Sequence, residues 1–149
     1  KKINGNPVSD PNYTEPKHTS VDPKHFDIVI EGMFDAFEKG TARGSRLEGS
    51  EMCGKTGTAE NPHGQDHSIF VAFAPKDDPK IAIAIIVENG YWGSRWAAPI
   101  ASLMIEKYIN GEITRETLEK RMLDGTLKEE YQKQLDAVYD KKKLIAENK

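Results

Sequence analysis

The sequence predicts an α+β fold in which helices cover an antiparallel sheet and a helical tail follows. Three short segments between residues 52 and 87 have the composition of strands and are separated by turn residues. Segments with helical periodicity stand before and after them. Because strands that follow one another directly in the chain pair as hairpins, the order helix, strand, strand, strand, helix predicts an antiparallel sheet.

The first helix is expected to begin at Asp22 and to end at Gly40. Asp22 is a favoured N-cap residue, and Pro23 fits the first helical position. Gly40 provides a C-terminal stop. Apolar residues recur between these limits at helical spacing, namely Phe26, Val29, Ile30, Met33 and Phe37.

The three strands are expected at Met52–Ala59, Ser68–Ala74 and Ile81–Val87, with the last two joined as a hairpin. In the third strand, one face carries isoleucine and valine alone. The other face carries Ala82, Ala84 and Ile86. Because both faces are apolar, we expect the sheet to be covered on both sides. The small alanine side chains are expected to let a helix approach closely.

A second helix is expected from about Trp96 to Asn110, where apolar residues again recur at helical spacing and Gly111 follows. Pro99 fits only within its first turn. Residues 114–123 are expected to form a shorter helix. The capping-box pattern Thr126-Leu127-Lys128-Glu129 then predicts another helix, in which apolar residues recur at Leu127, Tyr131, Leu135 and Val138.

These elements divide the chain into an extended connecting arm (residues 1–21), a main portion (22–111) and a helical tail (112–149). The net charge of the 149 residues is −3, and no basic patch interleaves with aromatic residues, which argues against nucleic-acid binding. The longest apolar run, Ile81–Val87, is far too short to span a membrane. Cys53 is the single cysteine, which excludes an internal disulfide. We interpret it as a small buried strand residue rather than as a thiol activated by Lys55.

Two catalytic signatures overlap between Gly49 and Thr58. Read from Gly49, the sequence fits the phosphate-loop pattern G-x-x-x-x-G-K-[ST], which predicts a nucleotide-binding protein. That pattern requires a buried strand before the loop and a helix after it. Residues 40–48 hold a single large apolar residue, and the glycine, asparagine and proline of residues 57–64 prevent a helix. The flanks therefore argue against a nucleotide site.

The second signature is the tetrad Lys55-Thr56-Gly57-Thr58, a K-T-G-T pattern found in penicillin-recognising serine acyl transferases. On a strand at the rim of a cleft, Gly57 leaves the backbone bare, so that an extended peptide can approach it. Lys55 supplies a positive charge, and Thr56 and Thr58 supply hydroxyls, the groups that hold a carboxylate-ended peptide. One alternative is a solvated lysine beside an ordinary turn. Another is a non-catalytic module that only binds peptides.

Other conspicuous side chains have less specific interpretations. His63, Asp66 and His67 are too few for a metal site without a further ligand, so we expect no metal there and place them at the rim of the cleft. The aromatic residues after the third strand have a surface suited to stacking on a sugar or a peptide. We interpret them instead as a hydrophobic lid over the sheet: Tyr91, Trp92 and Trp96.

Seven spaced blocks, taken together, carry a resemblance to a known family. They resemble, in order, the C-terminal part of the transpeptidase domain of a class B penicillin-binding protein of the cell-elongation type. The resemblance extends from about Ser20 to Tyr108. The blocks are Asp22-Pro23-Lys24-His25-Phe26, Glu31-Gly32-Met33, Gly40-Thr41-Ala42, Gly54-Lys55-Thr56-Gly57-Thr58-Ala59, Phe73-Ala74-Pro75, Val87-Glu88-Asn89-Gly90 and Ala97-Ala98-Pro99-Ile100-Ala101.

This resemblance implies a partial transpeptidase fold and a peptidoglycan D,D-transpeptidase that acts through a serine acyl-enzyme and is acylated by β-lactams. It implies that Lys55 orients the substrate carboxylate and tunes proton transfer, and that Thr56 and Thr58 bind that carboxylate or the adjoining amide. The backbone N–H of Thr58 would form one arm of the oxyanion hole, and Gly57 would keep the strand bare. No cofactor is implied. The implied partners are stem peptides, β-lactams, a glycosyltransferase and proteins of the elongation complex.

The chain departs from the family pattern in one large respect. The family also carries S-x-x-K, which holds the nucleophile, and S-x-N, both upstream of K-T-G. None of the seven serines begins either pattern, and Tyr108-Ile109-Asn110 follows the tetrad instead of preceding it. The chain also starts without an initiator methionine. We therefore expect an inactive C-terminal fragment of an enzyme that is anchored at the periplasmic face of the bacterial inner membrane.

Overall fold

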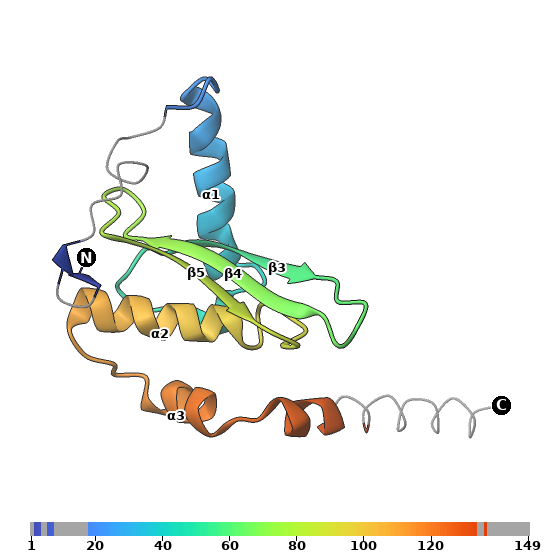
Figure 1. Cartoon of the computed structure of the whole chain (residues 1–149). Coiled ribbons are helices and arrows are strands. Elements are labelled where there is room, and N and C mark those ends of the chain that lie inside the picture. The colour runs from blue at the N-terminus through green and yellow to red at the C-terminus, as the bar shows by residue number, and fades with distance from the viewer. Residues whose placement is uncertain (1, 4–5, 8–17, 134–135, 137–149) are drawn as a thin grey trace.

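The computed structural model describes residues 2–3, 6–7, 18–133 and 136. Two short strands, β1 (Lys2–Ile3) and β2 (Asn6–Pro7), form a small antiparallel pair. The main part contains α1 (Lys24–Glu38), a 3-10 turn η2 (Arg43–Ser45) and a sheet of β3 (Cys53–Ala59), β4 (His67–Ala74) and β5 (Ile81–Val87). Helices α2 (Ala97–Asn110) and α3 (Glu116–Asp124) follow the sheet (Figure 1).

The three-stranded sheet is antiparallel in the order β3-β4-β5, so β4 lies in the middle. Lys55 of β3 is opposite Val71, and Phe70 of β4 is opposite Ile85. The predicted strands are confirmed to within one residue at each end, and so is the α+β class. Because β3 and β5 are the outer strands, each has one edge that no other described strand pairs with.

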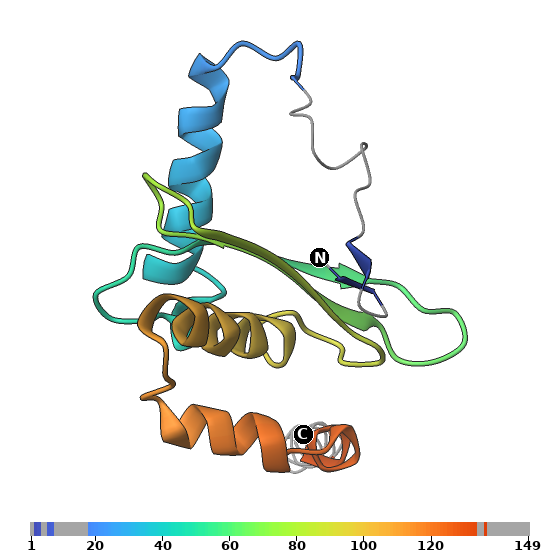
Figure 2. The same cartoon turned by 60° about the vertical axis from the view of Figure 1, so that its left-hand side comes forward.

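Helix α2 covers one face of the sheet and forms the core with it. The buried apolar residues of β4 are Phe70, Ala72 and Ala74, and they pack in one cluster with the small residues of α2. Those are Ala97, Ala98 and Ala101, whose short side chains let the helix approach the strands. Figures 1 and 2 show α2 along this side, whereas α1 projects from the opposite side.

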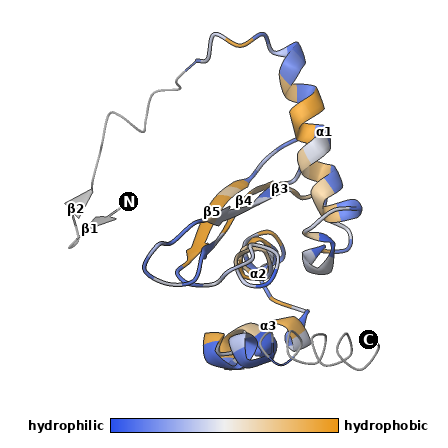
Figure 3. Cartoon of the chain, turned by 90° about the vertical axis from the view of Figure 1, so that its right-hand side faces the viewer, coloured by the Kyte–Doolittle hydropathy of each residue, from blue (hydrophilic) through white to orange (hydrophobic). Residues whose placement is uncertain are grey.

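The expectation that the alanine face of β5 receives a helix is wrong. Ile81, Ile83 and Ile85 point toward the core, whereas Ala82 and Ala84 are exposed. The alanines that permit close approach come from α2, so the larger isoleucines of β5 are needed to fill the space. Within the described residues the other face of β5 has no cover, and Ile86 there is 66% exposed. Figure 3 shows that β5 is hydrophobic along its length.

Helix α1 begins and ends as the sequence predicts. The backbone N–H of Lys24 donates to Asp22 Oδ1 at 3.1 Å, which makes Asp22 a cap. At the other end, the N–H of Gly40 donates to the Asp35 carbonyl at 2.9 Å. A Cβ on Gly40 would lie 2.8 Å from Ala36 Cα, so the turn requires glycine. Phe37 reaches the core and meets the Phe70 ring edge-on, with 5.6 Å between the ring centroids.

Helix α3 and the helical residues 127–133 of the tail lie on the far side of α2 from the sheet (Figures 1 and 2). Helix α2 ends at Gly111, whose φ of +79° is the left-handed conformation that favours glycine. The shorter helix is confirmed as α3, and residues 127–133 are helical. The Glu129 N–H donates to Thr126 Oγ1 at 3.3 Å, so Thr126 caps this helix as the sequence pattern predicts. Leu135 and Val138, expected on the same helix, lie outside the described residues. None of the helices among the described residues is long and apolar enough to cross a membrane.

Candidate functional site

The tetrad lies on β3, where this strand leaves the core and reaches the surface. Cys53 and Gly54 are buried, whereas Lys55 and Thr58 are exposed and the two residues between them are half-buried. A Cβ on Gly54 would lie 2.5 Å from the Phe70 ring, so the start of β3 packs directly against this ring and has no room for a side chain at Gly54. Because β3 is an outer strand, alternate backbone groups of the tetrad point to an edge that no described strand occupies.

Lys55 carries a charge that no described carboxylate neutralises. Its ammonium nitrogen Nζ donates to the Thr56 carbonyl at 2.8 Å. The ion pairs within the described part of the chain involve other lysines and arginines. Lys55 therefore presents an exposed cation beside the open edge, where an anionic group can reach it.

Thr56 has a second contact, which sequence reasoning missed. Its hydroxyl lies 3.0 Å from the hydroxyl of Thr41, in the turn that follows α1. The block Gly40-Thr41-Ala42 contributed to the family resemblance, but its threonine received no role at the site. The two threonines are fifteen residues apart, and only the folded chain shows that their side chains meet.

Gly57 is packed from behind by the loop between β5 and α2. A Cβ on Gly93 would lie 2.9 Å from the Gly57 carbonyl oxygen and would also collide with the carbonyl of Ile69. Ser68 of β4 fixes this loop, because its hydroxyl donates to the Trp92 carbonyl at 3.0 Å and accepts from the Ala97 N–H at 3.2 Å. The backbone of the tetrad strand therefore rests on a loop that leaves no room for a side chain.

The polar loop between β3 and β4 is held by its own side chains. Asp66 Oδ1 accepts from the Asn61 N–H at 3.3 Å, and His67 Nδ1 accepts from the Asn89 N–H at 3.0 Å. The Asn61 side chain also donates to Asn89 Oδ1 at 3.1 Å. These contacts join the β3–β4 loop to the loop that follows β5. Across the described residues, no three His, Cys, Asp or Glu side chains gather in a group able to hold a metal.

The aromatic residues after β5 divide into a buried and an exposed set. Trp96 is 8% exposed, but the contact that buries it is with Gly125 of the tail and not with the sheet, over which a lid was expected. Trp92 is 47% exposed. The centroid of its ring lies 5.1 Å from that of Tyr91 and 5.8 Å from the Arg95 guanidinium carbon. Trp92 therefore lies at the surface, beside the Arg95 cation, on the same loop that supports Gly57.

Cys53 is a structural residue, as the sequence interpretation held. Its side chain is fully buried, and its sulfur lies 3.7 Å from the Ile30 carbonyl of α1. Burial raises the pKa of the Cys53 thiol to about 11, and the charge of Lys76 opposes this only in part. The thiol therefore stays protonated near neutral pH and is a poor nucleophile.

A buried carboxylate in α2 also escaped sequence reasoning. Glu106 is fully buried, and its oxygens accept from Thr114 Oγ1 at 2.7 Å and from Arg115 Nε at 2.9 Å. Arg115 further donates to the Ser45 carbonyl and to the Ser102 hydroxyl. Burial acts to raise the pKa of Glu106, but the hydrogen bonds from Thr114 and Arg115 outweigh it and hold that pKa below its ordinary value.

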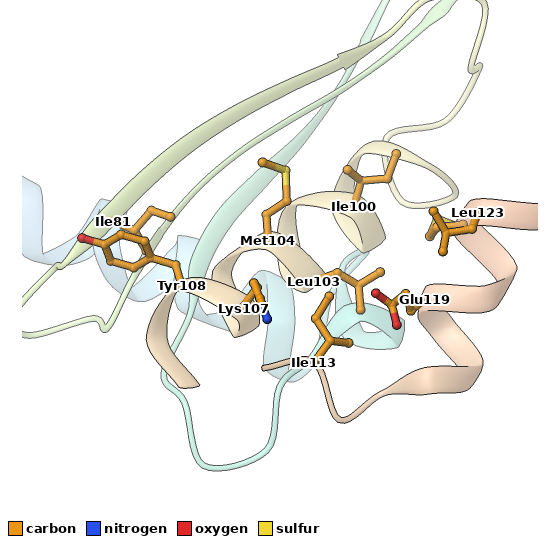
Figure 4. A pocket seen from close by; sticks show the side chains of 10 residues that line it. Ile81, Ile100, Leu103, Met104, Lys107, Tyr108, Ile113, Glu119 and Leu123 are labelled. Atoms are coloured by element: carbon orange, nitrogen blue, oxygen red, sulfur yellow. The ribbon is translucent and has the colours of Figure 1, made fainter. Parts of the chain in front are cut away.

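A cavity of about 800 Å³ lies between α2, α3 and the start of β5, away from the tetrad (Figure 4). Its walls are mainly apolar, and none of the predicted site residues contributes to them. The residues that line it are Ile81, Ile100, Leu103, Met104, Lys107, Tyr108, Ile113, Glu119, Met122 and Leu123.

The geometry decides between the two overlapping signatures. A phosphate loop would place Lys55 at the start of a helix, but Lys55 and Thr56 lie inside β3. An antiparallel sheet packed on α2, with Lys-Thr-Gly-Thr on its outer strand, instead defines the class of penicillin-recognising transpeptidase domains. Residues 2–106 match the family described as penicillin binding protein transpeptidase domain. The chain belongs to this family, and the match contains the whole tetrad.

Individual relatives agree with this assignment. The chain is 37% identical over 94 residues to the peptidoglycan D,D-transpeptidase MrdA of Acinetobacter baumannii, an alignment that covers 53% of this chain and 14% of that protein. It is 40% identical over 86 residues to the peptidoglycan D,D-transpeptidase PbpA of Mycobacterium tuberculosis, covering 50% of this chain and 17% of the relative. The chain therefore spans between about one-seventh and one-sixth of the length of these relatives.

Solved structures show the same fold. PBP2 of Pseudomonas aeruginosa, in complex with WCK 5153, superimposes with a TM-score of 0.58 at 35% identity, over 77% of this chain and 26% of that one. The imipenem acyl-enzyme complex of penicillin-binding protein A from M. tuberculosis superimposes with a TM-score of 0.55 at 35% identity, over 62% and 21% of the two chains. The partial transpeptidase fold expected from the sequence is confirmed.

Proposed function

We propose that this chain forms one wall of the active site of a peptidoglycan D,D-transpeptidase. The observation that carries the proposal is the exposed Lys55 ammonium, bonded to the Thr56 carbonyl beside the open edge of β3. Family membership and the peptidoglycan D,D-transpeptidase names of the relatives support it. The domain division at residues 22–111 and 112–149 remains part of this proposal.

The tetrad on β3 would act by holding the terminal carboxylate of a stem peptide. Lys55 supplies a positive charge, while the hydroxyls of Thr56 and Thr58 supply hydrogen-bond donors. Gly57 leaves space beside the strand, so that an extended peptide can pair with the backbone of β3. In this position the peptide would form the strand that the open edge lacks.

Thr58 would also stabilise the charge that develops during acyl transfer. The backbone groups of Thr56 and Thr58 project to the same edge, because these groups alternate along a strand. The Thr56 carbonyl accepts from the Lys55 side chain, which supports the assignment of this edge as the open one. The N–H of Thr58 would then donate to the oxyanion of a tetrahedral intermediate.

The covalent chemistry would come from a serine supplied by residues other than these 149. Its hydroxyl oxygen attacks the penultimate D-alanine carbonyl, and an ester forms as the peptide C–N bond breaks. Terminal D-alanine leaves with the proton. An amine on a neighbouring stem peptide then attacks the ester, forms the cross-link and returns the proton to the serine. Lys55 would assist these proton transfers through its charge.

The proposed substrate implies where the complete protein works and what it binds. Peptidoglycan lies outside the cytoplasm, so we place the complete enzyme at the periplasmic face of the inner membrane, with an anchor in its remaining sequence. β-lactams would acylate it, since a family neighbour is described as an imipenem acyl-enzyme complex. A glycosyltransferase and other proteins of cell elongation are the proposed partners.

Removal of Lys55 tests the proposal directly. In a complete transpeptidase domain that contains these residues, Lys55→Ala should lower the second-order rate of acylation by a fluorescent penicillin on the order of 10²-fold, because the carboxylate loses its charged partner. Lys39→Ala provides a matched control, since Lys39 is an exposed lysine paired with Asp35 on α1. Near-normal acylation of the Lys55 variant would contradict the role proposed for this lysine.

A second experiment concerns the missing nucleophile. The isolated 149-residue chain is expected to show no covalent label after incubation with fluorescent penicillin, because none of its serines begins S-x-x-K. Intact-mass measurement gives the stoichiometry without dependence on fluorescence. A stable mass increase equal to one penicillin would show that the chain carries its own nucleophile and would sink this part of the proposal.

A further inference from the structure

Two contacts converge on Thr56, one on its backbone and one on its side chain. Lys55 Nζ donates to the Thr56 carbonyl at 2.8 Å, and the Thr41 hydroxyl lies 3.0 Å from the Thr56 hydroxyl. We propose that Thr41 is a positioning residue, which donates its proton to Thr56 Oγ1 and thereby directs the Thr56 proton toward the substrate carboxylate. This inference rests on the proposed function and assigns a role to a residue outside the tetrad.

The direction of the bond follows from the number of protons available. Each threonine hydroxyl has one proton to donate and two lone pairs that accept. When Thr56 donates to a carboxylate, its single proton is committed, so the bond between the two hydroxyls requires Thr41 as donor. A hydroxyl that accepts one bond is polarised and donates the next more strongly. Thr41 therefore strengthens the contact between Thr56 and an anion without touching that anion.

The turn after α1 holds Thr41 in place through its backbone. On one side, Gly40 is fixed by the bond from its N–H to the Asp35 carbonyl, at 2.9 Å. On the other, the N–H of Ala42 donates to the Ala36 carbonyl at 2.9 Å, and its side chain is 1% exposed. Thr41 itself is exposed between these two anchored residues. Its hydroxyl is thus presented to β3 by the end of a helix.

A purely structural bond between the same hydroxyls makes different predictions. An exposed hydrogen bond contributes little to folding, and its loss affects every ligand of the site equally. A positioning role affects only ligands whose carboxylate contacts Thr56. The distinction therefore requires a paired comparison of ligands with and without that carboxylate, in addition to a comparison of variants.

Thr41→Val and Thr41→Ser form the central pair of variants in a complete transpeptidase domain. Valine keeps the shape and removes the hydroxyl, whereas serine keeps the hydroxyl. We expect Thr41→Val to lower the acylation efficiency toward a carboxylate-bearing β-lactam about tenfold, and Thr41→Ser to stay within about twofold of the wild type. For the same β-lactam with its carboxylate converted to an amide, Thr41→Val should match the wild type. Thermal unfolding checks that each variant is folded, and Thr41→Ala serves if valine is not tolerated.

A double-mutant cycle with Thr56→Val completes the test. If Thr41 acts through Thr56, Thr41→Val should have no further effect in the Thr56→Val background. Equal loss with the acid and the amide, additive effects in the cycle, or failure of serine to rescue would each overturn the assignment. Loss in Lys55→Ala together with normal acylation in Thr41→Val would overturn this assignment alone. A folded wild-type domain that no β-lactam acylates would overturn the proposed function and this inference with it.

Discussion

The chain contains two polar clusters that differ in how their hydrogen-bonding groups are used. The closed cluster surrounds Glu106, whose fully buried carboxylate accepts from Thr114 and Arg115. The open cluster contains Lys55, Thr56 and Thr41 at the outer edge of β3, where the lysine is exposed and donates only to a neighbouring carbonyl. The closed cluster satisfies its charges within the chain, whereas the open cluster leaves a charge and donors for a ligand.

Whether a polar group serves stability or function is indicated by its partners. A group whose hydrogen bonds and charge are satisfied within the chain holds the fold, whereas a group left without partners can bind a ligand. Buried charges require partners, because desolvation without them is costly. The Glu106 carboxylate has such partners, and through Arg115, which also donates to the Ser45 carbonyl, it links α2 to η2 and the tail. An exposed lysine has no such requirement and adds little to folding. The two clusters therefore predict opposite responses to mutation.

The largest expected effect is at Glu106. Glu106→Ala leaves the Arg115 guanidinium without its buried partner, and the free energy of unfolding should fall by about 3–5 kcal/mol. Urea unfolding of the 149-residue chain, followed by circular dichroism, measures this change. Glu112→Ala is the matched control, since this exposed glutamate follows the same helix and should shift stability by less than about 0.5 kcal/mol. Equal stability of the two variants would show that the closed cluster does not hold the fold.

The next effect concerns the loop that supports the open cluster. Gly93→Ala places a Cβ against the Gly57 and Ile69 carbonyls and should cost about 1–3 kcal/mol of unfolding free energy. The Gly57 carbonyl belongs to the backbone of β3, so the added Cβ can be accommodated only if the tetrad strand shifts. We therefore also expect slower acylation in a complete domain. Gly44→Ala is the control, because a Cβ there meets nothing within 4 Å and should be nearly neutral. An equally stable Gly93 variant would show that the loop does not constrain β3.

The pH dependence of stability gives a smaller effect, because it reports only the proton-linked part of the closed cluster. The folded-state pKa of Glu106 lies below its ordinary value of 4.5. Its contribution to stability is therefore fully present above about pH 4.5 and is lost as the pH falls through the lower, folded-state value. The Glu106→Gln variant should lack this step. Unfolding midpoints measured between pH 7 and pH 3 would contradict the prediction if the wild type and the variant declined in parallel.

Local sequence patterns were sufficient for the elements and for the tetrad. Short runs with strand composition, bounded by turn residues, predict β3, β4 and β5, and the order Lys55-Thr56-Gly57-Thr58 holds the groups of the proposed site within four consecutive positions. Contacts between distant segments were not predictable in this way. Thr41 meets Thr56 only because α1 ends beside β3. Glu106 lies in a mainly apolar helix, and nothing in that helix indicates that Arg115 returns to pair with it.

The orientation of β5 was mispredicted for a related reason. Its two faces are both apolar, so the sequence of the strand does not state which one faces the helix. The residues of α2 decide, because three alanines there leave room for Ile81, Ile83 and Ile85. Which face of a strand is buried is thus a property of the pair of elements. The sequence of one strand alone is therefore not sufficient to predict which of its faces is buried.

The smallest expected effect on stability is at Lys55, although its effect on acylation should be severe. Lys55→Met keeps the apolar stem and removes the charge. Since the exposed ammonium bonds only to the Thr56 carbonyl, the free energy of unfolding should change by no more than about 0.5 kcal/mol. Urea unfolding of Lys55→Met and Glu106→Ala under the same conditions compares how much each cluster contributes to the free energy of unfolding. A loss above about 1 kcal/mol in Lys55→Met would place this lysine among the residues that hold the fold. Such a result would contradict the distinction between the two clusters, because Lys55 of the open cluster would then stabilise the fold as Glu106 of the closed cluster does.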